Sequence, residues 1–259
     1  MALELRPASA FSLDELAALF TAGYEGYLLP FRIDAATLSA MNSAFDIDLD
    51  ASRVALRDGE AVGLANLALR GEEAWIGGVG VVVSARRQGV AEALMRALHD
   101  EGRGRGVSTV WLEVIEQNDV AYRLYDRLGY EVVRDVEVWS LAADEAGGSA
   151  TEIPAAEAHA RIQELRTSRE PWQRADGTLA HYDDLAGLAS DDGVAVFRAG
   201  PTVQLLQIAG SSFDELLRSL RARGPVSALN IPADDPAAAA LRDLGASMVV
   251  RQHEMKLAL

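Results

Sequence analysis

The sequence feature that most constrains the fold is the stretch from Val81 to Leu98. It opens on three β-branched valines, which favour an extended strand, and continues through a short polar turn containing Gly89. Ala91–Leu98 then places leucines and a methionine on one face of a helix. A strand that leads directly into a helix points free backbone amides and the positive end of the helix dipole at one spot. This pattern predicts an anion site, although a glycine that serves only the turn would look the same.

Antiparallel strands are predicted before this stretch. Residues 52–57, 61–70 and 74–83 read as extended runs, and Asp58-Gly59 and Arg70-Gly71 between them suit tight turns. Two helices are expected upstream. The first covers Leu13–Tyr24 behind a capping box at Ser12 and Glu15, and the second covers Ala35–Asn42 behind Asp34.

The order after Leu98 alternates strands and helices. Residues 108–115 suit a strand, 120–128 a helix that ends at Gly129, and 130–141 two further short strands. An antiparallel meander that leads into alternating strands and helices predicts an α/β fold with a mixed central sheet flanked by helices.

Composition narrows the classes of function. The chain has 259 residues, no cysteine and a formal charge of −15, so disulfides, thiolate chemistry and general nucleic-acid binding are disfavoured, while a cationic amine is mildly favoured. The four histidines are scattered, so we expect no metal. Neither a membrane-spanning run nor a signal peptide is visible, which leads us to expect a cytoplasmic protein that does not bind membranes.

Several motifs agree in order and spacing with one known family. Arg86-x-x-Gly89-x-Ala91 follows the valine-rich strand, and the later motifs are Leu112-Glu113-Val114, Asn118, Ala121, Leu124-Tyr125 and Leu128-Gly129-Tyr130. Together they resemble the GNAT acyltransferase superfamily over about Leu3 to Leu141. The resemblance implies the GNAT fold, in which two parallel strands, here 74–83 and 108–115, splay apart to admit acetyl-CoA.

The resemblance also implies which residues hold the cofactor. Backbone groups of Val81 and Val83 would pair with the pantetheine arm, and amides from Arg87 to Ala91 would bind the pyrophosphate. The side chain of Asn118 would bind the pantetheine end, although it also suits a helix N-cap. The full set of expected cofactor residues is Val81, Val82, Val83, Arg86, Arg87, Gln88, Gly89, Val90, Ala91 and Asn118.

Two side chains are candidates for acid–base catalysis. Glu113 lies five residues before Asn118, as the base does in the ribosomal-protein N-terminal acetyltransferases of the superfamily; an exposed strand glutamate is the alternative. Tyr125 lies two helical turns after Asn118 and resembles the family's general acid, the alternative being a packing tyrosine. The carbonyl would be polarised by a main-chain amide near Val81.

The strand before the turn departs from several GNAT subfamilies, because Trp75-Ile76-Gly77-Gly78-Val79-Gly80 carries no carboxylate. This gives more weight to Glu113, or to deprotonation through water. The glycines leave room for a bulkier substrate or for another backbone. Tyr24, Tyr27 and Trp75 are candidate substrate residues, each with a core position as the alternative.

The second half resembles a degenerate copy of the first. A shift of 116 residues places Leu128-Gly129 on Leu244-Gly245 and Ala121 on Ala237, while Tyr125 is replaced by Leu241 and Asn118 by Asp234. Expected elements are a helix at 213–221, a strand at 226–231, a helix at 236–244 and a strand at 247–257. An unrelated small α/β domain is the alternative.

These observations predict a tandem-domain N-acetyltransferase. The expected division is a GNAT domain at 1–143, a linker at 144–150 and a smaller GNAT-like α/β domain at 151–259, with one acetyl-CoA per chain. The acceptor would be a primary amine of a small molecule, amino acid or peptide terminus, and a homodimer is compatible with the sequence. The alternative function is a non-catalytic acyl-CoA-binding sensor.

Overall fold

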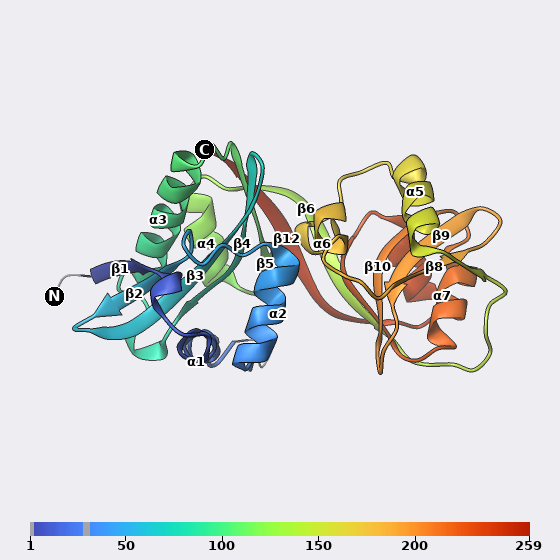
Figure 1. Ribbon diagram of the computed structural model, residues 1–259, viewed down its shortest axis with the longest axis horizontal. Helices are drawn as coiled ribbons and strands as arrows, with labels where there is room; N and C mark the ends of the chain where they lie inside the picture. Colours follow the sequence, from blue (N-terminus) through green and yellow to red (C-terminus); the bar gives the residue numbers. More distant parts are fainter. Residues whose placement is uncertain (1–2, 28–31) are drawn as a thin grey trace. The chain divides into compact units, whose positions relative to one another are not determined.

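The computed structural model describes residues 3–27 and 32–259, which fold into two compact units (Figure 1). Unit 1 comprises the chain up to Leu112 together with 123–131 and 255–259, and unit 2 comprises 113–122 and 132–254. This division differs from the expected boundaries at 143 and 151. The cause is visible in the chain path, since β5 (Thr109–Ile115), β6 (Glu131–Leu141) and β12 (Ser247–Ala258) each contribute residues to both units.

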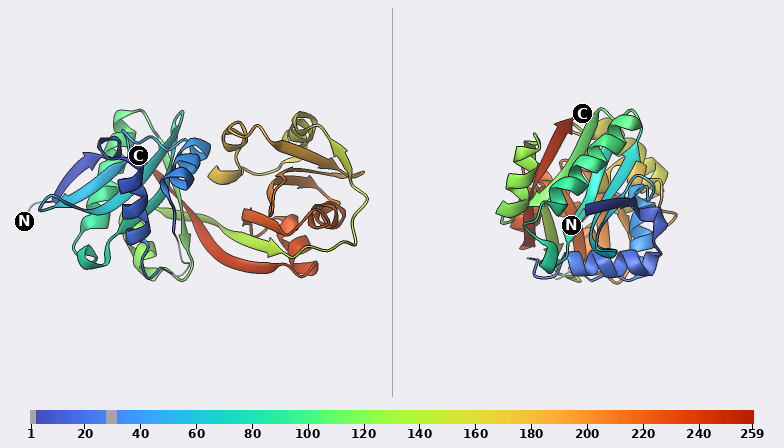
Figure 2. Two further views of the ribbon diagram at one scale, coloured as in Figure 1. Left: turned by 60° about the horizontal axis from the view of Figure 1, so that its bottom comes forward. Right: turned by 90° about the vertical axis from the view of Figure 1, so that its left-hand side faces the viewer.

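Unit 1 begins with the predicted antiparallel meander. The strand pairs run β1 with β2, β2 with β3 and β3 with β4, and β4 then pairs in parallel with β5. Helices cover both faces of these strands (Figure 2). On β3, Gly63 faces α3, while the neighbouring Leu64 packs with α1. The bounds are β1 (Leu3–Pro7), α1 (Leu13–Gly23), α2 (Ala35–Phe45), β2 (Arg53–Arg57), β3 (Glu60–Arg70), β4 (Glu73–Val81), η2 (Val83–Ala85), α3 (Val90–Gly104) and α4 (Asp119–Arg127); the short 3₁₀ turn η1 is Ala8–Ala10.

Both predicted helix caps at the start of the chain are present. The Glu15 amide donates to the Ser12 hydroxyl at 3.3 Å, and the Ser12 amide donates back to the Glu15 carboxylate at 2.8 Å. Asp34 accepts from the amide of Thr37 at 2.8 Å. These short-range signals locate the helix starts because they need only residues three apart.

The prediction of two short strands in 130–141 was wrong, because the structure has one long strand, β6. Nothing in Glu131–Leu141 turns the chain, since the segment contains no glycine, proline or asparagine. In the sheet, β6 lies between β12 and β11 in the order β1-β2-β3-β4-β5-β12-β6-β11-β10-β9-β8-β7. The closing strand of the second half, β12, therefore stands between β5 and β6.

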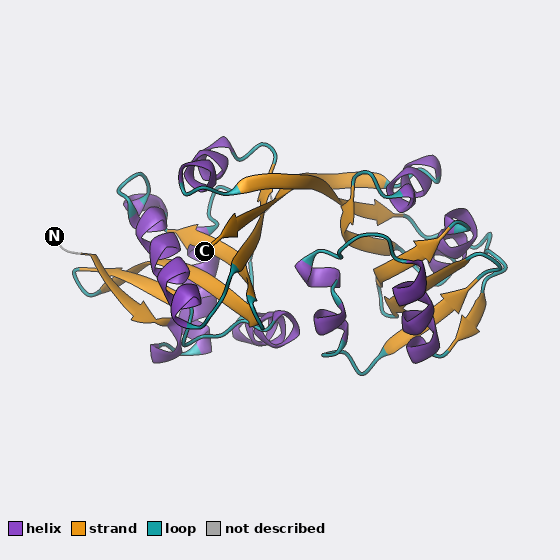
Figure 3. Ribbon diagram, turned by 90° about the horizontal axis from the view of Figure 1, so that it is seen from above, coloured by secondary structure: helices purple, strands orange, loops and turns teal. Residues whose placement is uncertain are grey.

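Unit 2 carries its own helices on both faces of its strands (Figure 3). On β9, Val194 and Val196 pack in the cluster that contains α5, while Ala195 and Phe197 pack with α7 and α8. The bounds are β7 (Thr151–Ile153), α5 (Ala155–Leu165), η3 (Trp172–Arg174), α6 (Asp176–Leu179), β8 (Leu185–Ala189), β9 (Gly193–Arg198), β10 (Val203–Gly210), α7 (Phe213–Arg221), β11 (Val226–Pro232) and α8 (Pro236–Asp243).

The internal repeat is present at the level of single hydrogen bonds. The Tyr130 amide donates to the carbonyl of Tyr125 at 3.0 Å, and 116 residues later the Ala246 amide donates to the carbonyl of Leu241 at 3.0 Å. The intervening glycines, Gly129 and Gly245, have φ of 91° and 79°. Leu241 thus occupies the position that corresponds to Tyr125. Alpha-helix α8 is capped by Asp235, however, and not by the Asp234 that the shift alone selects.

The segment expected as a linker has no helix or strand, yet it is bound to α7. The amide of Ala150 donates to the Ser219 hydroxyl at 3.2 Å, and a Cβ on Gly148 would lie 2.3 Å from the carbonyl oxygen of Glu215. Residues 144–150 therefore pack against α7 within unit 2. No helix among the described residues is long and apolar enough to cross a membrane.

Candidate active site

The turn between β4 and α3 presents an uncapped helix N-terminus. Arg87 and Gly89 both adopt left-handed backbone conformations, with φ of 59° and 79°, and Gly89 is the N-cap residue of α3. No side chain caps this end, and the amides of residues 87–91 have no backbone acceptor within the described part of the chain. These amides and the helix dipole suit a phosphate group.

Space in front of this turn is open, as a phosphate requires. A Cβ built on Gly89 would meet no atom within 4 Å, and Val83, Arg87, Gln88 and Gly89 are all exposed. Gln88 is held over the turn by its own amide group, which donates to the carbonyl of Ser84 at 2.9 Å. The residues present therefore fit the pyrophosphate of acetyl-CoA, which the backbone would bind.

The two arginines of the motif differ in their contacts. Arg86 donates to the carbonyl of Val81 at 2.9 Å and to the carbonyls of Gly23 and Glu25 at 3.1 and 2.6 Å. Its guanidinium thus ties the end of α1 to the end of β4. Arg87 is exposed, so the positive charge at the rim of the turn comes from Arg87.

The parallel strands β4 and β5 are hydrogen-bonded at one end only. Their ladder joins Glu73–Trp75 to Thr109–Trp111 and stops there. Just beyond it, β4 bulges against β3, because Ile76 and Gly78 face consecutive residues of β3 and Gly77 is extra. A bulge strengthens local twist and redirects the strand. This is the splay that the family resemblance implied.

The glycines of β4 make room for the end of α1. Of the two uses expected for this space, a bulkier substrate or another backbone, the structure shows the backbone. A Cβ on Gly23 would lie 2.8 Å from the Cα atom of Gly80, and a Cβ on Gly78 would lie 2.9 Å from the hydroxyl of Tyr24. The amide of Val79 hydrogen-bonds the Tyr24 hydroxyl. The close packing of α1 on β4 therefore explains why this strand has glycines and no carboxylate.

Three tyrosine hydroxyls gather in unit 1. The ring of Tyr24 stacks on Phe20 at 4.7 Å and meets Tyr27 edge-on at 5.1 Å. Burial is the main reason that the pKa of Tyr125 is raised, and the nearby Tyr27 adds to the effect. The pKa of Tyr24 is also raised, mainly by burial and to a smaller extent by Tyr125 and Tyr27. The phenols of Tyr24 and Tyr125 keep their protons at neutral pH, so Tyr125 can act as a proton donor but not as a base.

Trp75 lies in the core and not on an open surface. It is 5% exposed, and its ring meets Phe45 of α2 edge-on at 5.6 Å. A Cβ on Gly77 would lie 2.6 Å from the Trp75 ring, so the bulge glycine accommodates the indole. The core alternative describes Trp75 better than substrate binding does.

Glu113 and Asn118 belong to unit 2, where both have defined contacts. The side-chain amide of Gln173 donates to Glu113 Oε2 at 3.0 Å, and Glu113 is partly buried. The Asn118 side chain accepts from the amide of Ala121 at 3.2 Å, which makes it the N-cap of α4. Sequence reasoning missed Gln173, since no motif surrounds it.

The second half repeats the strand geometry without the phosphate turn. Its parallel strands β10 and β11 pair over three positions, Val203–Leu205 with Val226–Ala228, and β10 bulges immediately afterwards. Only Ser211 and Ser212 separate β10 from α7, whereas residues 82–89 separate β4 from α3. The 3₁₀ helix η3 packs against β11, and Gln207 at the bulge donates to the carbonyl of Arg174 in η3 at 2.6 Å.

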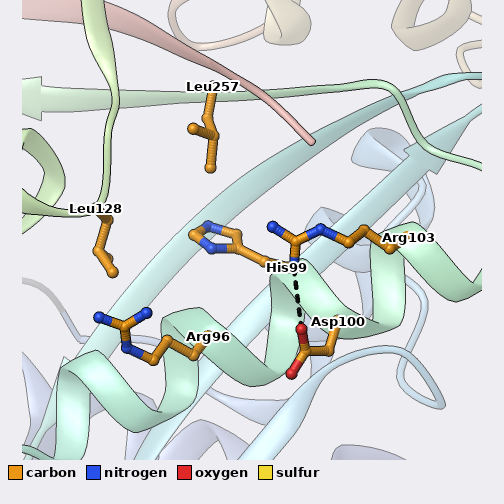
Figure 4. Close-up of a pocket in the computed structure, with 6 residues that line it drawn as sticks. All are labelled: Arg96, His99, Asp100, Arg103, Leu128 and Leu257. Atoms are coloured by element: carbon orange, nitrogen blue, oxygen red, sulfur yellow. Dashed lines mark hydrogen bonds and ion pairs between the residues drawn. The ribbon is translucent and has the colours of Figure 1, made fainter.

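A separate cavity of about 190 Å³ lies along α3 in unit 1 (Figure 4). Its lining residues are Arg96, His99, Asp100, Arg103, Leu128 and Leu257. None of these belongs to the turn at Gly89 or to the expected catalytic pair. Among the described residues, no group of three or more metal-ligating side chains lies close enough together to hold a metal ion.

Comparison with known proteins agrees with this geometry. Residues 18–130 match the family model described as the acetyltransferase (GNAT) family. The chain is 37% identical over 62 residues, or 24% of its length, to the [ribosomal protein bS18]-alanine N-acetyltransferase of Haemophilus ducreyi, and it spans 43% of that enzyme.

Similarity of fold extends over the whole chain. A GCN5-related N-acetyltransferase from Sphaerobacter thermophilus superposes with a TM-score of 0.77 at 14% identity, covering 99% of this chain and 95% of the other. A tandem GNAT protein from the clavulanic acid biosynthesis pathway superposes with a TM-score of 0.68 at 15% identity, covering 99% and 98%. At these identities the likeness concerns the fold, which is that of two GNAT-like lobes in one chain.

The motif turn at Gly89, the bulged and splayed strand pair and the family match over residues 18–130 agree, and this part of the chain belongs to the GNAT acetyltransferase family.

Proposed function

We propose that this protein is an acetyl-CoA-dependent N-acetyltransferase that transfers the acetyl group directly to a primary amine. The observation that carries the proposal is the uncapped turn at residues 87–91, whose amides and left-handed Gly89 suit a pyrophosphate in a chain of this family. The amine belongs to a small molecule, an amino acid or a peptide terminus. The relative from Haemophilus ducreyi is named for an alanine of ribosomal protein bS18, which supports the inclusion of peptide acceptors.

Two side chains carry the proton transfers in this proposal. Bound acetyl-CoA supplies a thioester whose carbonyl carbon is the electrophile. Glu113 accepts a proton from the protonated amine, which leaves a lone pair on nitrogen for the new C–N bond. Tyr125 delivers its phenolic proton to the sulfur atom as the C–S bond breaks, and the proton that the nitrogen loses as it becomes an amide returns the phenolate of Tyr125 to the phenol. The phenol of Tyr125 is protonated at neutral pH, as a proton donor must be before transfer, and its burial makes it a weaker acid than a solvated phenol.

Main-chain groups and Asn118 bind and orient in the same proposal. The amides of 87–91 hold the pyrophosphate, and an amide of β4 near Val81 polarises the carbonyl. The oxygen of Asn118 caps α4, so any contact of this residue with the cofactor would come from its nitrogen. The second lobe lacks the phosphate turn, which leads us to expect one acetyl-CoA per chain.

The test is to follow CoA release while amines are offered one class at a time: polyamines, free amino acids, and peptides with alanine or other small N-terminal residues. We expect at least one class to be consumed, with the acetyl group found on nitrogen by mass spectrometry. Calorimetric titration with acetyl-CoA should give one site per chain. Tight binding of acetyl-CoA with no amine consumed would favour a non-catalytic acyl-CoA sensor instead.

A further inference from the structure

The 3₁₀ helix η3 is anchored on both sides of Gln173. The Thr178 hydroxyl donates to the carbonyl of Trp172 at 2.6 Å, and the Gln207 side chain donates to the carbonyl of Arg174 at 2.6 Å. Trp172 and Arg174 are each 2% exposed. The backbone that carries Gln173 is therefore held in place from the core of unit 2, so its side chain starts from a fixed position.

The orientation of the Gln173 amide follows from its partner. Its nitrogen lies 3.0 Å from Glu113 Oε2, and a carboxylate offers only acceptors, so the nitrogen and not the oxygen must face Glu113. The side chain is 8% exposed. Its oxygen, Oε1, is buried and has no hydrogen-bond partner within residues 3–27 and 32–259. A buried acceptor beside a carboxylate is thus available for one further N–H group.

We propose that Gln173 is a positioning residue for acetyl transfer: its N–H orients the Glu113 carboxylate, and its carbonyl oxygen accepts a hydrogen bond from the acceptor amine. The inference rests on the proposed function, in which Glu113 is the base. Gln173 exchanges no proton, because the amine proton passes to Glu113. A second N–H of the same nitrogen bonds to Gln173.

The chemistry of a primary amine matches this pair of acceptors. A protonated primary amine has three N–H groups, and after one proton has been lost two N–H groups and a lone pair remain. Holding one N–H on Gln173 while Glu113 removes another proton fixes the direction of the lone pair, and orientation of this kind accounts for large rate effects. The 3₁₀ helix η3, which carries Gln173, contacts β10 and β11 within unit 2.

The first test compares Gln173→Met with Gln163→Met, a matched change at an exposed glutamine of unit 2. With an amine that the wild type consumes, we expect Gln173→Met to lower kcat/KM for the amine by about 10- to 100-fold, as loss of orientation does. The Kd for acetyl-CoA should stay unchanged, and Gln163→Met should behave as the wild type. Equal activities of the two variants would overturn the inference.

The second test asks whether Gln173 acts through Glu113. In a cycle of Gln173→Met, Glu113→Gln and the double variant, the effect of the methionine should shrink strongly once the carboxylate is absent. An undiminished effect would mean that Gln173 acts independently, which contradicts the inference. If the wild type binds acetyl-CoA but consumes no amine, the proposed function itself fails, an outcome that needs no variant to recognise.

A third variant covers the case in which Gln173→Met does not fold. Gln173→Glu keeps the size and one acceptor oxygen but replaces the N–H donor with a second carboxylate. We expect the KM for the amine to stay within about 3-fold of the wild type while kcat falls by about 10-fold or more, because the acceptor remains and the support of Glu113 is lost. Unchanged kcat in a folded Gln173→Glu protein would overturn the inference.

Discussion

His99 Nε2 lies 2.9 Å from the hydroxyl of Tyr130, and this buried contact joins α3 to the residue at which the chain leaves α4. The two side chains are 4% and 3% exposed, and their ring centroids are 5.6 Å apart. Burial, together with the nearby positive charge of Arg103, lowers the pKa of His99 to about 4. Figure 4 shows the imidazole beside the cavity, among Leu128, Leu257 and Arg96.

The neutral His99 predicts a loss of stability in mild acid. An unfolded histidine has a pKa near about 6.5. Below that pH the histidine of the unfolded chain is protonated, whereas His99 of the folded chain is not protonated until about pH 4. The free energy of unfolding therefore falls as the pH drops from about 6.5 to about 4. Above about pH 6.5 this residue contributes no pH dependence. His99→Gln should reduce the difference in urea stability between about pH 7.5 and 5 by about 2 kcal/mol.

The comparison is with the wild-type protein, measured at the same two pH values. If His99→Gln keeps the full acid sensitivity of the wild type, the buried imidazole is not its source.

Alanine substitutions at Gly89 and Gly59 can distinguish the effect of backbone strain from the effect on cofactor binding. Their φ values are 79° and 84°, and a Cβ on either would meet no atom within 4 Å. Replacement by alanine should therefore destabilise both proteins similarly, by about 1 kcal/mol, through left-handed strain. Only Gly89→Ala should weaken acetyl-CoA binding, by about 10-fold as measured by calorimetry, because it alone disturbs amides that face the phosphate. Equal affinities of the two variants would contradict this role of the turn.

Arg86 and Arg87 are adjacent, but their replacement should have different effects. Arg86→Ala removes the hydrogen bonds that tie α1 to β4 and should lower the free energy of unfolding by about 1–3 kcal/mol. Arg87→Ala at the exposed rim should change stability by less than about 0.5 kcal/mol. It should instead raise the Kd for acetyl-CoA and reduce the dependence of that Kd on salt, because a screened surface charge is lost. A Kd that responds to neither salt nor Arg87→Ala would exclude the rim charge.

Tyr125 and Tyr122 provide a matched pair on α4. Tyr125→Phe should lower kcat on a productive amine by about 100-fold, the range of general acid catalysis, without changing the Kd for acetyl-CoA. Tyr122→Phe should keep kcat, since that ring contacts His253 edge-on at 5.6 Å and has no proposed part in the chemistry. Single-turnover rates are the suitable measurement, because they separate chemistry from product release. An unchanged rate for Tyr125→Phe would remove this phenol as the acid.

Local and repeated patterns were readable from the sequence alone. The capping box at Ser12, the Asp34 cap and the turn at Gly89 depend on residues within a few positions of one another, and the structure contains all three. The shift of 116 residues also predicted that Leu241 stands where Tyr125 does, and the matching hydrogen bonds confirm it. Such features follow from short-range geometry and from a duplicated order of elements, which are written directly in the sequence.

Tertiary structure alone decided which long-range partner each side chain meets. Sequence spacing left Gly78 and Gly80 open to a substrate or a backbone, and only packing shows that Tyr24 and Gly23 fill the space. Packing also decided which strands flank β6, namely β11 and β12, because both come from segments far along the chain. Gln173 contacts Glu113 across 60 positions with no motif around it. Contacts of this kind depend on how whole elements pack, and no local periodicity encodes them.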